Sequence, residues 1–180
     1  MNYTKIISSG LGILGLAALV VAFTTSFTSK PAKTEEKAPS ITWYSYEEGS
    51  KLAEKKNKKI FIDVYTDWCG WCKQMDKTTF KDAKVIAYMN EKFIAVKLDA
   101  ESAKSTVYQS KVLTERELAL NILQANSYPT TAYLDERQNI IQPIPGYQDA
   151  ATQDKIMHFF GDNHYKTKTW DQFLLEYQPK

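Results

Sequence analysis

An almost unbroken apolar run, KIFIDVY at residues 59–65, is the clearest structural pattern in the chain. A run of this kind is typical of a strand that is covered on both faces. Residues 93–98 repeat the pattern, and the stretch at residues 83–90 between the two runs reads as a helix. Because a crossover helix joins parallel strands, these segments predict a parallel β-α-β unit.

Two capping boxes, in which serine or threonine is followed by glutamate on the first helical turn, mark helix starts. One predicts a helix from Ser45 to about residue 57, and the other a helix from Thr114 to about residue 125. The stretch before the second helix is less regular. Residues 106–112 form either a short hairpin or an ordered loop.

The last part of the chain predicts a β-hairpin and two helices. These elements are strands at residues 130–134 and 140–144 and helices at residues 150–160 and 170–177. Pro143 and Pro145 place the second strand at a sheet edge or at its own end, since proline cannot donate to a ladder. Thr169 and Gln172 cap the last helix. The order of elements, without internal repeats, predicts an α/β domain.

The N-terminus departs from this pattern. A basic start leads into an apolar run at residues 6–23 and then into small polar residues, which is the plan of a secretory signal. The run is also near the length of a membrane span, so an uncleaved anchor stays open. We assign residues 1–27 to a signal peptide or anchor, 28–40 to a flexible linker, 41–162 to the main domain and 163–180 to a C-terminal helical extension. We expect an exported protein of the bacterial periplasm, either soluble or N-terminally anchored.

Composition adds little to the prediction of the fold, but it limits the kinds of partner that the protein is expected to bind. The chain carries 23 Lys and Arg against 21 Asp and Glu, for a net charge of +2. The basic residues are scattered, and the aromatic residues lie among apolar ones rather than in a basic patch. We therefore expect no nucleic-acid partner. The length suits one hydrophobic core, and we expect a monomer.

Cys69 and Cys72 are the only cysteines, and they follow directly after the first buried strand. On the first turn of a helix, residues i and i+3 share a face at a separation that a disulfide can bridge. The first thiol would also lie at the positive end of the helix dipole, which favours the thiolate. A bridge that closes so short a loop restrains the unfolded chain little, so the pair suits a switch better than a structural staple.

Half a zinc site is another interpretation of the pair. It would need two further ligands, and the only histidines, His158 and His164, lie far away in the sequence. We therefore expect no metal and no cofactor.

Asp63 interrupts the buried apolar run. An ionised carboxylate is costly in such a place, so burial should raise the pKa of this side chain. The alternative is a residue near the strand end that reaches solvent.

Three separated motifs resemble the thioredoxin-like family over residues 41–162. They are the stretch DVYTDWCGWCK at residues 63–73, Tyr128-Pro129-Thr130, which matches the cis-proline turn of the family, and Gly146 after the last strand. The longer Trp-Cys-x-x-Cys-Lys-x-Met context also resembles exported members, including the C-terminal domain of the transmembrane thiol-reducing carrier. The resemblance implies a thioredoxin fold, with a central mixed sheet flanked by helices. An insertion would precede the cis-proline turn, and an extra helix would follow at the C-terminus.

The resemblance also implies catalytic roles. Cys69 would be the exposed attacking thiolate, and the more buried Cys72 would resolve the mixed disulfide. Asp63 would match the buried acid that relays a proton for the resolving cysteine. Lys97 matches the lysine near that acid, although it could equally be a surface lysine at a strand end. Pro129 would be cis and would shape a groove beside Cys69.

A substrate groove around the pair follows from the same resemblance. The residues assigned to it are Trp68, Gly70, Trp71, Tyr128 and Thr130. The backbone of Tyr128 would pair with an extended peptide, and Trp68 would shield the sulfurs. Trp71 is either a substrate contact or an exposed ring.

The chain departs from thioredoxin in several places. Trp71 replaces the proline between the cysteines, and that dipeptide influences the redox potential in the family. No histidine lies there, so the strong thiolate stabilisation of dedicated oxidants is not expected. The insertion at residues 100–127 either packs over the sheet or recognises a partner. The extra C-terminal segment around Trp170 is expected to be an amphipathic docking helix.

These observations predict an exported thiol–disulfide oxidoreductase that uses Cys69 and Cys72 to reduce or exchange protein disulfides. Its partners would be protein disulfides and a thiol electron donor or acceptor. The alternatives are a disulfide oxidase or isomerase, and a non-catalytic binding module in which the bridge is static.

Overall fold

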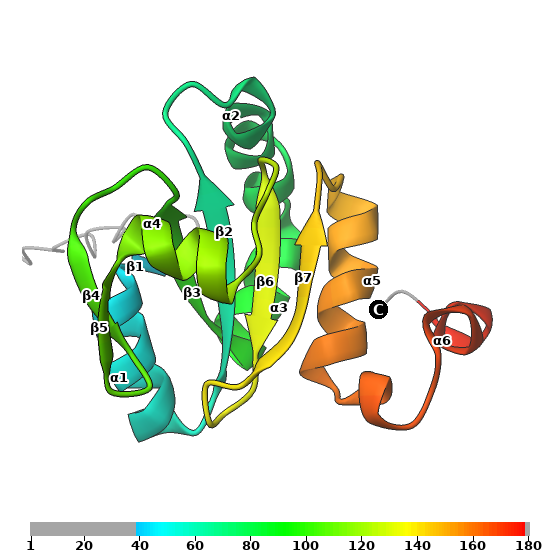
Figure 1. Cartoon of the computed structure of the whole chain (residues 1–180). Coiled ribbons are helices and arrows are strands. Elements are labelled where there is room, and N and C mark those ends of the chain that lie inside the picture. The colour runs from blue at the N-terminus through cyan, green and yellow to red at the C-terminus, as the bar shows by residue number, and fades with distance from the viewer. Residues whose placement is uncertain (1–38, 179–180) are drawn as a thin grey trace, which may run out of the picture. The chain divides into compact units, whose positions relative to one another are not determined.

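A five-stranded mixed sheet lies at the centre of the computed structural model, which describes residues 39–178 (Figure 1). The strand order is β1-β3-β2-β6-β7. The strands are β1 (Trp43–Tyr44), β2 (Lys59–Tyr65), β3 (Phe93–Asp99), β6 (Thr130–Leu134) and β7 (Ile140–Pro145). β1 and β2 run parallel to β3, whereas β6 runs antiparallel to β2 and β7 antiparallel to β6. The predicted mixed sheet is therefore confirmed.

The predicted signal or anchor and nearly all of the predicted linker lie outside the described residues. Within residues 39–178, no helix is both long enough and apolar enough to cross a membrane.

The central strand β2 is covered on both faces, as its apolar run predicts. Successive side chains of a strand point to opposite faces. Ile60 and Ile62 accordingly belong to one buried cluster and Phe61 to the other, and all three have 0% exposure. The β2–β3 pair with its crossover helix α3 (Ala83–Lys92) confirms the predicted β-α-β unit.

One face of the sheet is covered by α1 (Tyr46–Lys56) and by the insertion. The Ser45 capping box forms at the start of α1 as predicted, with Glu48 bonded back to the Ser45 backbone. The insertion begins with a hairpin, β4 (Ser105–Tyr108) and β5 (Lys111–Thr114), so the hairpin is the correct one of the two expected forms. It continues as α4 (Glu115–Glu117) and a π-helical segment, Leu118–Ile122, which ends a little earlier than predicted.

The insertion at residues 100–127 packs over the sheet, which is one of the two roles expected for it. Leu118 and Leu123 are fully buried in the cluster under α1 and the hairpin. The ring of Tyr108 lies 6.2 Å from that of Tyr46, and its hydroxyl donates to the Gln138 carbonyl at 3.2 Å.

The other face is covered by α2 (Gly70–Lys77), α3 and α5 (Ala150–Gly161). After α5 comes α6 (Trp170–Glu176), capped by Thr169 and Gln172 as predicted. Phe173 of α6 is 3% exposed and lies 5.3 Å from the Phe159 ring, so this helix packs on its own domain.

Sequence patterning missed β1 and two short 3₁₀ turns, Thr79–Lys81 and His164–Lys166. Each is too short to express a period of its own.

Gly49 is the point where α1 comes closest to the sheet. A Cβ atom there would lie 2.4 Å from Cγ2 of Val96 on β3. We expect Gly49→Ala to lower the free energy of unfolding by about 1–3 kcal/mol, the usual cost of overpacking. Urea unfolding of the oxidised protein measures this. In Gly70→Ala the new methyl meets nothing within 4 Å, so this control should keep wild-type stability. Equal stability of Gly49→Ala and wild type would contradict the packing.

Candidate active site

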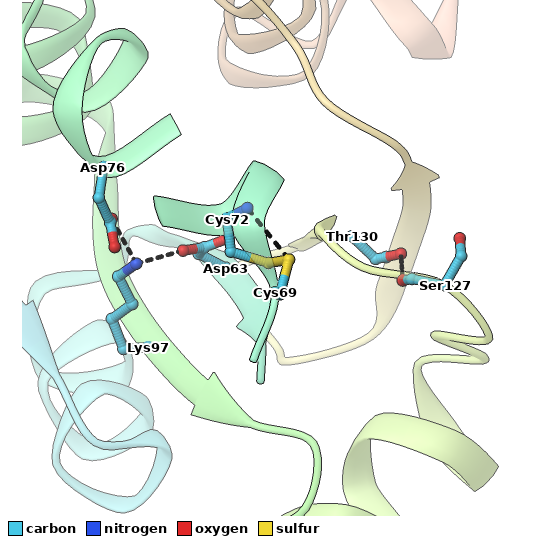
Figure 2. Close-up of a disulfide and its surroundings, with 7 residues drawn as sticks. All are labelled: Asp63, Cys69, Cys72, Asp76, Lys97, Ser127 and Thr130. Atoms are coloured by element: carbon cyan, nitrogen blue, oxygen red, sulfur yellow. Dashed lines mark hydrogen bonds and ion pairs between the residues drawn. A yellow bond between two sulfur atoms is a disulfide. The ribbon is translucent and has the colours of Figure 1, made fainter. Parts of the chain in front are cut away.

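The cysteine pair occupies the start of α2, where the chain leaves the central strand (Figure 1). Cys69 is the N-cap residue, and its Sγ accepts the Cys72 backbone N–H at 3.0 Å. The two sulfurs are joined in a disulfide with an S–S distance of 2.00 Å and a Cα–Cα distance of 5.3 Å (Figure 2). The predicted position of the pair on a strand-to-helix turn is confirmed.

The expected difference in exposure between the two cysteines is wrong for this oxidised state. Cys69 is 3% exposed and Cys72 is 2% exposed. The Cys69 sulfur is bonded to the Cys72 sulfur and accepts the Cys72 N–H, so both contacts direct it toward the helix.

Asp63 is the buried acid of this site, and it does not reach solvent. Its side chain is 1% exposed, and it lies on the same sheet face as Phe61, two positions earlier on β2. Lys97 is its direct register partner on β3, and the Lys97 Nζ lies 2.5 Å from Asp63 Oδ2. The structure therefore brings these two predicted residues together.

A second carboxylate, that of Asp76, completes this cluster. Lys97 Nζ lies 2.6 Å from Asp76 Oδ1, so one ammonium bridges both acids. Cys72 and Asp76 are related as i and i+4 and share a face of α2. This places the cluster on the Cys72 side of the helix, and in the view of Figure 2 the Asp63 carboxyl group lies between Lys97 and the disulfide.

Sequence reasoning missed Asp76. Its i+4 spacing from Cys72 is the signal that could have identified it.

Burial raises the pKa of Asp63, although the Lys97 charge opposes this shift. Asp63 Oδ1 has no hydrogen-bond partner among the described residues. The cost of burying this oxygen away from water is therefore not offset by a hydrogen bond. For Lys97, burial lowers the pKa, but the two carboxylates outweigh it and the net direction is upward. Its ammonium also lies 4.9 Å from the centre of the Trp43 ring.

The Tyr128-Pro129 peptide bond is cis, as the family resemblance implied. The Gly146 N–H donates to the Pro129 carbonyl at 2.8 Å and ties this turn to the end of β7. Gly146 has φ +90, a conformation that favours glycine. The buried Thr130 hydroxyl donates to the Ser127 carbonyl at 2.7 Å (Figure 2), so this side chain shapes the turn.

Two exposed tryptophans lie next to the cysteines in the sequence: Trp68 precedes Cys69, and Trp71 stands between Cys69 and Cys72. Trp68 is 66% exposed and donates from Nε1 to Glu101 at 3.0 Å, with its ring edge-on to Tyr128 at 6.0 Å. Trp71 is 62% exposed and lies against Tyr147 at 5.2 Å. Glu101 and Tyr147 were not singled out from the sequence, because only the fold brings their loops to the cysteines.

The histidines are engaged away from the cysteine pair. His158 stacks on Tyr88 with ring centres 3.7 Å apart, and its Nδ1 lies 2.9 Å from the Asp154 carbonyl. His164 lies 5.0 Å from the Phe173 ring. Within residues 39–178, no three His, Cys, Asp or Glu side chains gather as a metal site would require.

A cysteine pair that closes a disulfide at a helix start, on this fold, defines the class of thiol–disulfide oxidoreductases. The thioredoxin-like domain family matches residues 46–161, more than half of the chain. The chain therefore belongs to the thioredoxin-like family, and the resemblance predicted from the sequence is confirmed.

Related sequences match only part of their own length. The thiol:disulfide interchange protein DsbD of Salmonella typhi is 31% identical over 110 residues, which make up 59% of this chain and 18% of that protein. A protein of Archaeoglobus fulgidus is 34% identical over 65 residues, or 36% of this chain and 51% of its own length. The chain thus spans about half of one relative and less than a fifth of the other.

Solved structures support the fold. A thioredoxin-fold protein from Helicobacter pylori has a TM-score of 0.59 at 21% identity and covers 67% of this chain and 80% of its own. A thioredoxin from Thermus thermophilus has a TM-score of 0.54 at 19% identity, covering 66% of this chain and 85% of its own. At these identities the likeness shows the fold alone.

The raised pKa of Asp63 has a consequence for stability. Because the folded state keeps a proton that the unfolded state has lost, the free energy of unfolding should fall as the pH rises through this pKa. Asp63→Asn removes the cost of ionising a buried carboxyl group, while Lys97 keeps Asp76 as an ion-pair partner. We expect the variant to be more stable than wild type at pH 8.

Urea unfolding of the oxidised proteins at pH 5 and pH 8 tests this expectation. Asp171→Asn removes an exposed carboxyl group and should follow wild type. A decline of equal size in Asp63→Asn and wild type would assign the pH dependence to another group.

Proposed function

We propose that this protein is an exported thiol–disulfide oxidoreductase whose reduced Cys69–Cys72 pair reduces or exchanges disulfides of other proteins. The observation that carries the proposal is the buried Asp63 carboxyl group on the Cys72 side of α2, linked through Lys97 to Asp76. A purely structural bridge has no need of a buried acid in which one oxygen lacks a hydrogen-bond partner among the described residues. This cluster therefore favours catalysis over the static binding module.

The reaction passes through a mixed disulfide. The Cys69 thiolate attacks one sulfur of the substrate disulfide, forms the mixed disulfide and releases the other substrate sulfur as a thiolate. The Cys72 thiolate then attacks Cys69 Sγ, releases the second substrate thiolate and closes the Cys69–Cys72 bridge. Two electrons pass from the dithiol to the substrate, and a thiol donor must reduce the pair again. The helix start stabilises the Cys69 thiolate.

Asp63 serves as the base for the resolving step. The Cys72 thiol must lose its proton before it can attack, and an acid whose pKa is raised lies closer to the thiol range than an ordinary carboxyl group. Lys97 and Asp76 connect Asp63 with the surface, since the Asp76 side chain is 46% exposed. The proton could leave the buried site along this route.

The substrate would enter beside the cis-proline turn. Among the described residues, the Tyr128 backbone makes no hydrogen bond to another backbone group, so it is free to pair with an extended peptide. Pro129, Trp68 and Gly70 would border the same groove.

The proposed export of the protein and the proposed direction of electron transfer rest on further observations. The basic, apolar and small-residue pattern at residues 1–27 supports export to the periplasm, and so does the similarity to DsbD, a thiol:disulfide interchange protein. The lack of a histidine between the cysteines favours a reductant. A disulfide oxidase or isomerase remains the second candidate, and a reduction potential far above that of thioredoxin would select it.

Reduction of insulin by the protein, with dithiothreitol as the electron source, tests the proposed activity. Cys69→Ser lacks the nucleophile and should reduce the rate to that of dithiothreitol alone. Cys72→Ser should accumulate a mixed disulfide on Cys69, which non-reducing electrophoresis detects. Wild-type turnover by Cys69→Ser would contradict the assignment.

Asp63→Asn should slow resolution of the mixed disulfide by about 10²–10⁴-fold at pH 7, the contribution of a positioned general base. The loss should shrink as the pH rises, because hydroxide then deprotonates Cys72 without Asp63. Rapid mixing of reduced protein with a model disulfide at pH 6, 7 and 9 measures this, with Asp171→Asn as the control. A loss that is the same at every pH would instead indicate a structural role for Asp63.

A further inference from the structure

Tyr147 contacts α2 near both ends of the helix, beside the cysteine pair. Its ring packs against Trp71, on the first turn, with ring centres 5.2 Å apart and planes inclined by 48°. Its hydroxyl lies 3.4 Å from Oγ1 of Thr78, the C-cap residue of the same helix. The residue directly follows Gly146, whose N–H is bonded to the Pro129 carbonyl. Tyr147 is therefore fixed relative to both the cysteine helix and the cis-proline turn.

A hollow of about 520 Å³ opens at this contact and is lined by Gly70, Trp71, Gln74 and Tyr147. Gly70 and Trp71 stand between the two cysteines in the sequence, so the hollow opens beside the residues that carry the disulfide. A Cβ atom on Gly70 would meet nothing within 4 Å, which shows that the space beside the pair is open.

The lining of the hollow is neutral. Two aromatic rings, a glycine and an amide surround it, so a charged side chain would find no counter-ion there. Aromatic faces attract other aromatic rings in offset or edge-on arrangements, and they bury aliphatic side chains well. On the other flank of the disulfide, Trp68 is already engaged by Glu101 and Tyr128.

We propose that Trp71 and Tyr147 form a specificity subsite for an aromatic or large aliphatic side chain next to the reactive cysteine of a polypeptide substrate. This inference rests on the proposed function, which brings such a polypeptide to Cys69. The occupant follows from the position of the hollow, beside the two residues that separate the cysteines, and from its uncharged lining. The subsite makes Trp71 a substrate contact and adds Tyr147 to the residues that select the substrate.

The test uses full-length reduced protein and disulfide-linked peptide dimers that differ only in the residue beside cysteine: phenylalanine, serine or lysine. The second-order rate constant for release of peptide thiol is measured by acid quench and chromatography. Wild type should reduce the phenylalanine peptide about tenfold faster than the serine peptide, the usual range for a filled apolar pocket. Tyr147→Ala should bring this ratio close to one, whereas Tyr147→Phe, which keeps the ring, should retain it.

Gln74→Glu gives a second readout that does not depend on the folding of a Tyr147 variant. Gln74 is exposed on α2, and a carboxylate there should raise the rate ratio of the lysine peptide to the phenylalanine peptide about tenfold. Val112→Ala changes an exposed residue of the β4–β5 hairpin and should keep the wild-type ratios.

The outcomes separate this inference from the proposed function. Equal wild-type rates on the phenylalanine and serine peptides would overturn the subsite and leave the oxidoreductase standing. A Tyr147→Ala variant that slows both peptides equally would also overturn it, since the residue would then only support the fold. No reduction of any peptide by wild type would overturn both proposals.

Discussion

The ion pair between Asp63 and Lys97 is the interaction on which the site depends. A carboxylate in the middle of a buried strand is costly, and the parallel register of β2 and β3 places a lysine directly opposite it. The same Lys97 ammonium also forms an ion pair with Asp76 on α2. One cation thus joins the central sheet to the helix that carries the cysteines. Within residues 39–178, the other Asp63 oxygen has no hydrogen-bond partner.

The sheet explains why this arrangement is possible. Alternation along β2 sends Ile60 and Ile62 toward α1 and sends Phe61 and Asp63 toward α2. A polar side chain can therefore occupy one position under the cysteine helix without disturbing the opposite core. The insertion seals that opposite core, while the face with Asp63 is covered by α2, α3 and α5.

Much of the fold was accessible from the sequence because its signals are local. The continuous apolar runs identified β2 and β3, and the capping boxes after Ser45, Thr114 and Thr169 placed three helix starts correctly. The two-residue β1 was not accessible, because a segment so short shows no period and is defined only by its pairing with β3. The exposure of Cys69 was also predicted wrongly, since it depends on how the closed disulfide turns its sulfur.

The sequence by itself determined the chemistry: a lone pair of cysteines at a helix start, a carboxyl group inside a buried strand and a proline turn that matches a known family. These features are read from residue types and short spacings. The tertiary structure alone decided which distant residues meet them. Asp76 shares Lys97 with Asp63, and Tyr147 lies on Trp71, because strand register and loop packing bring together segments that are far apart in the chain. No local pattern encodes that proximity.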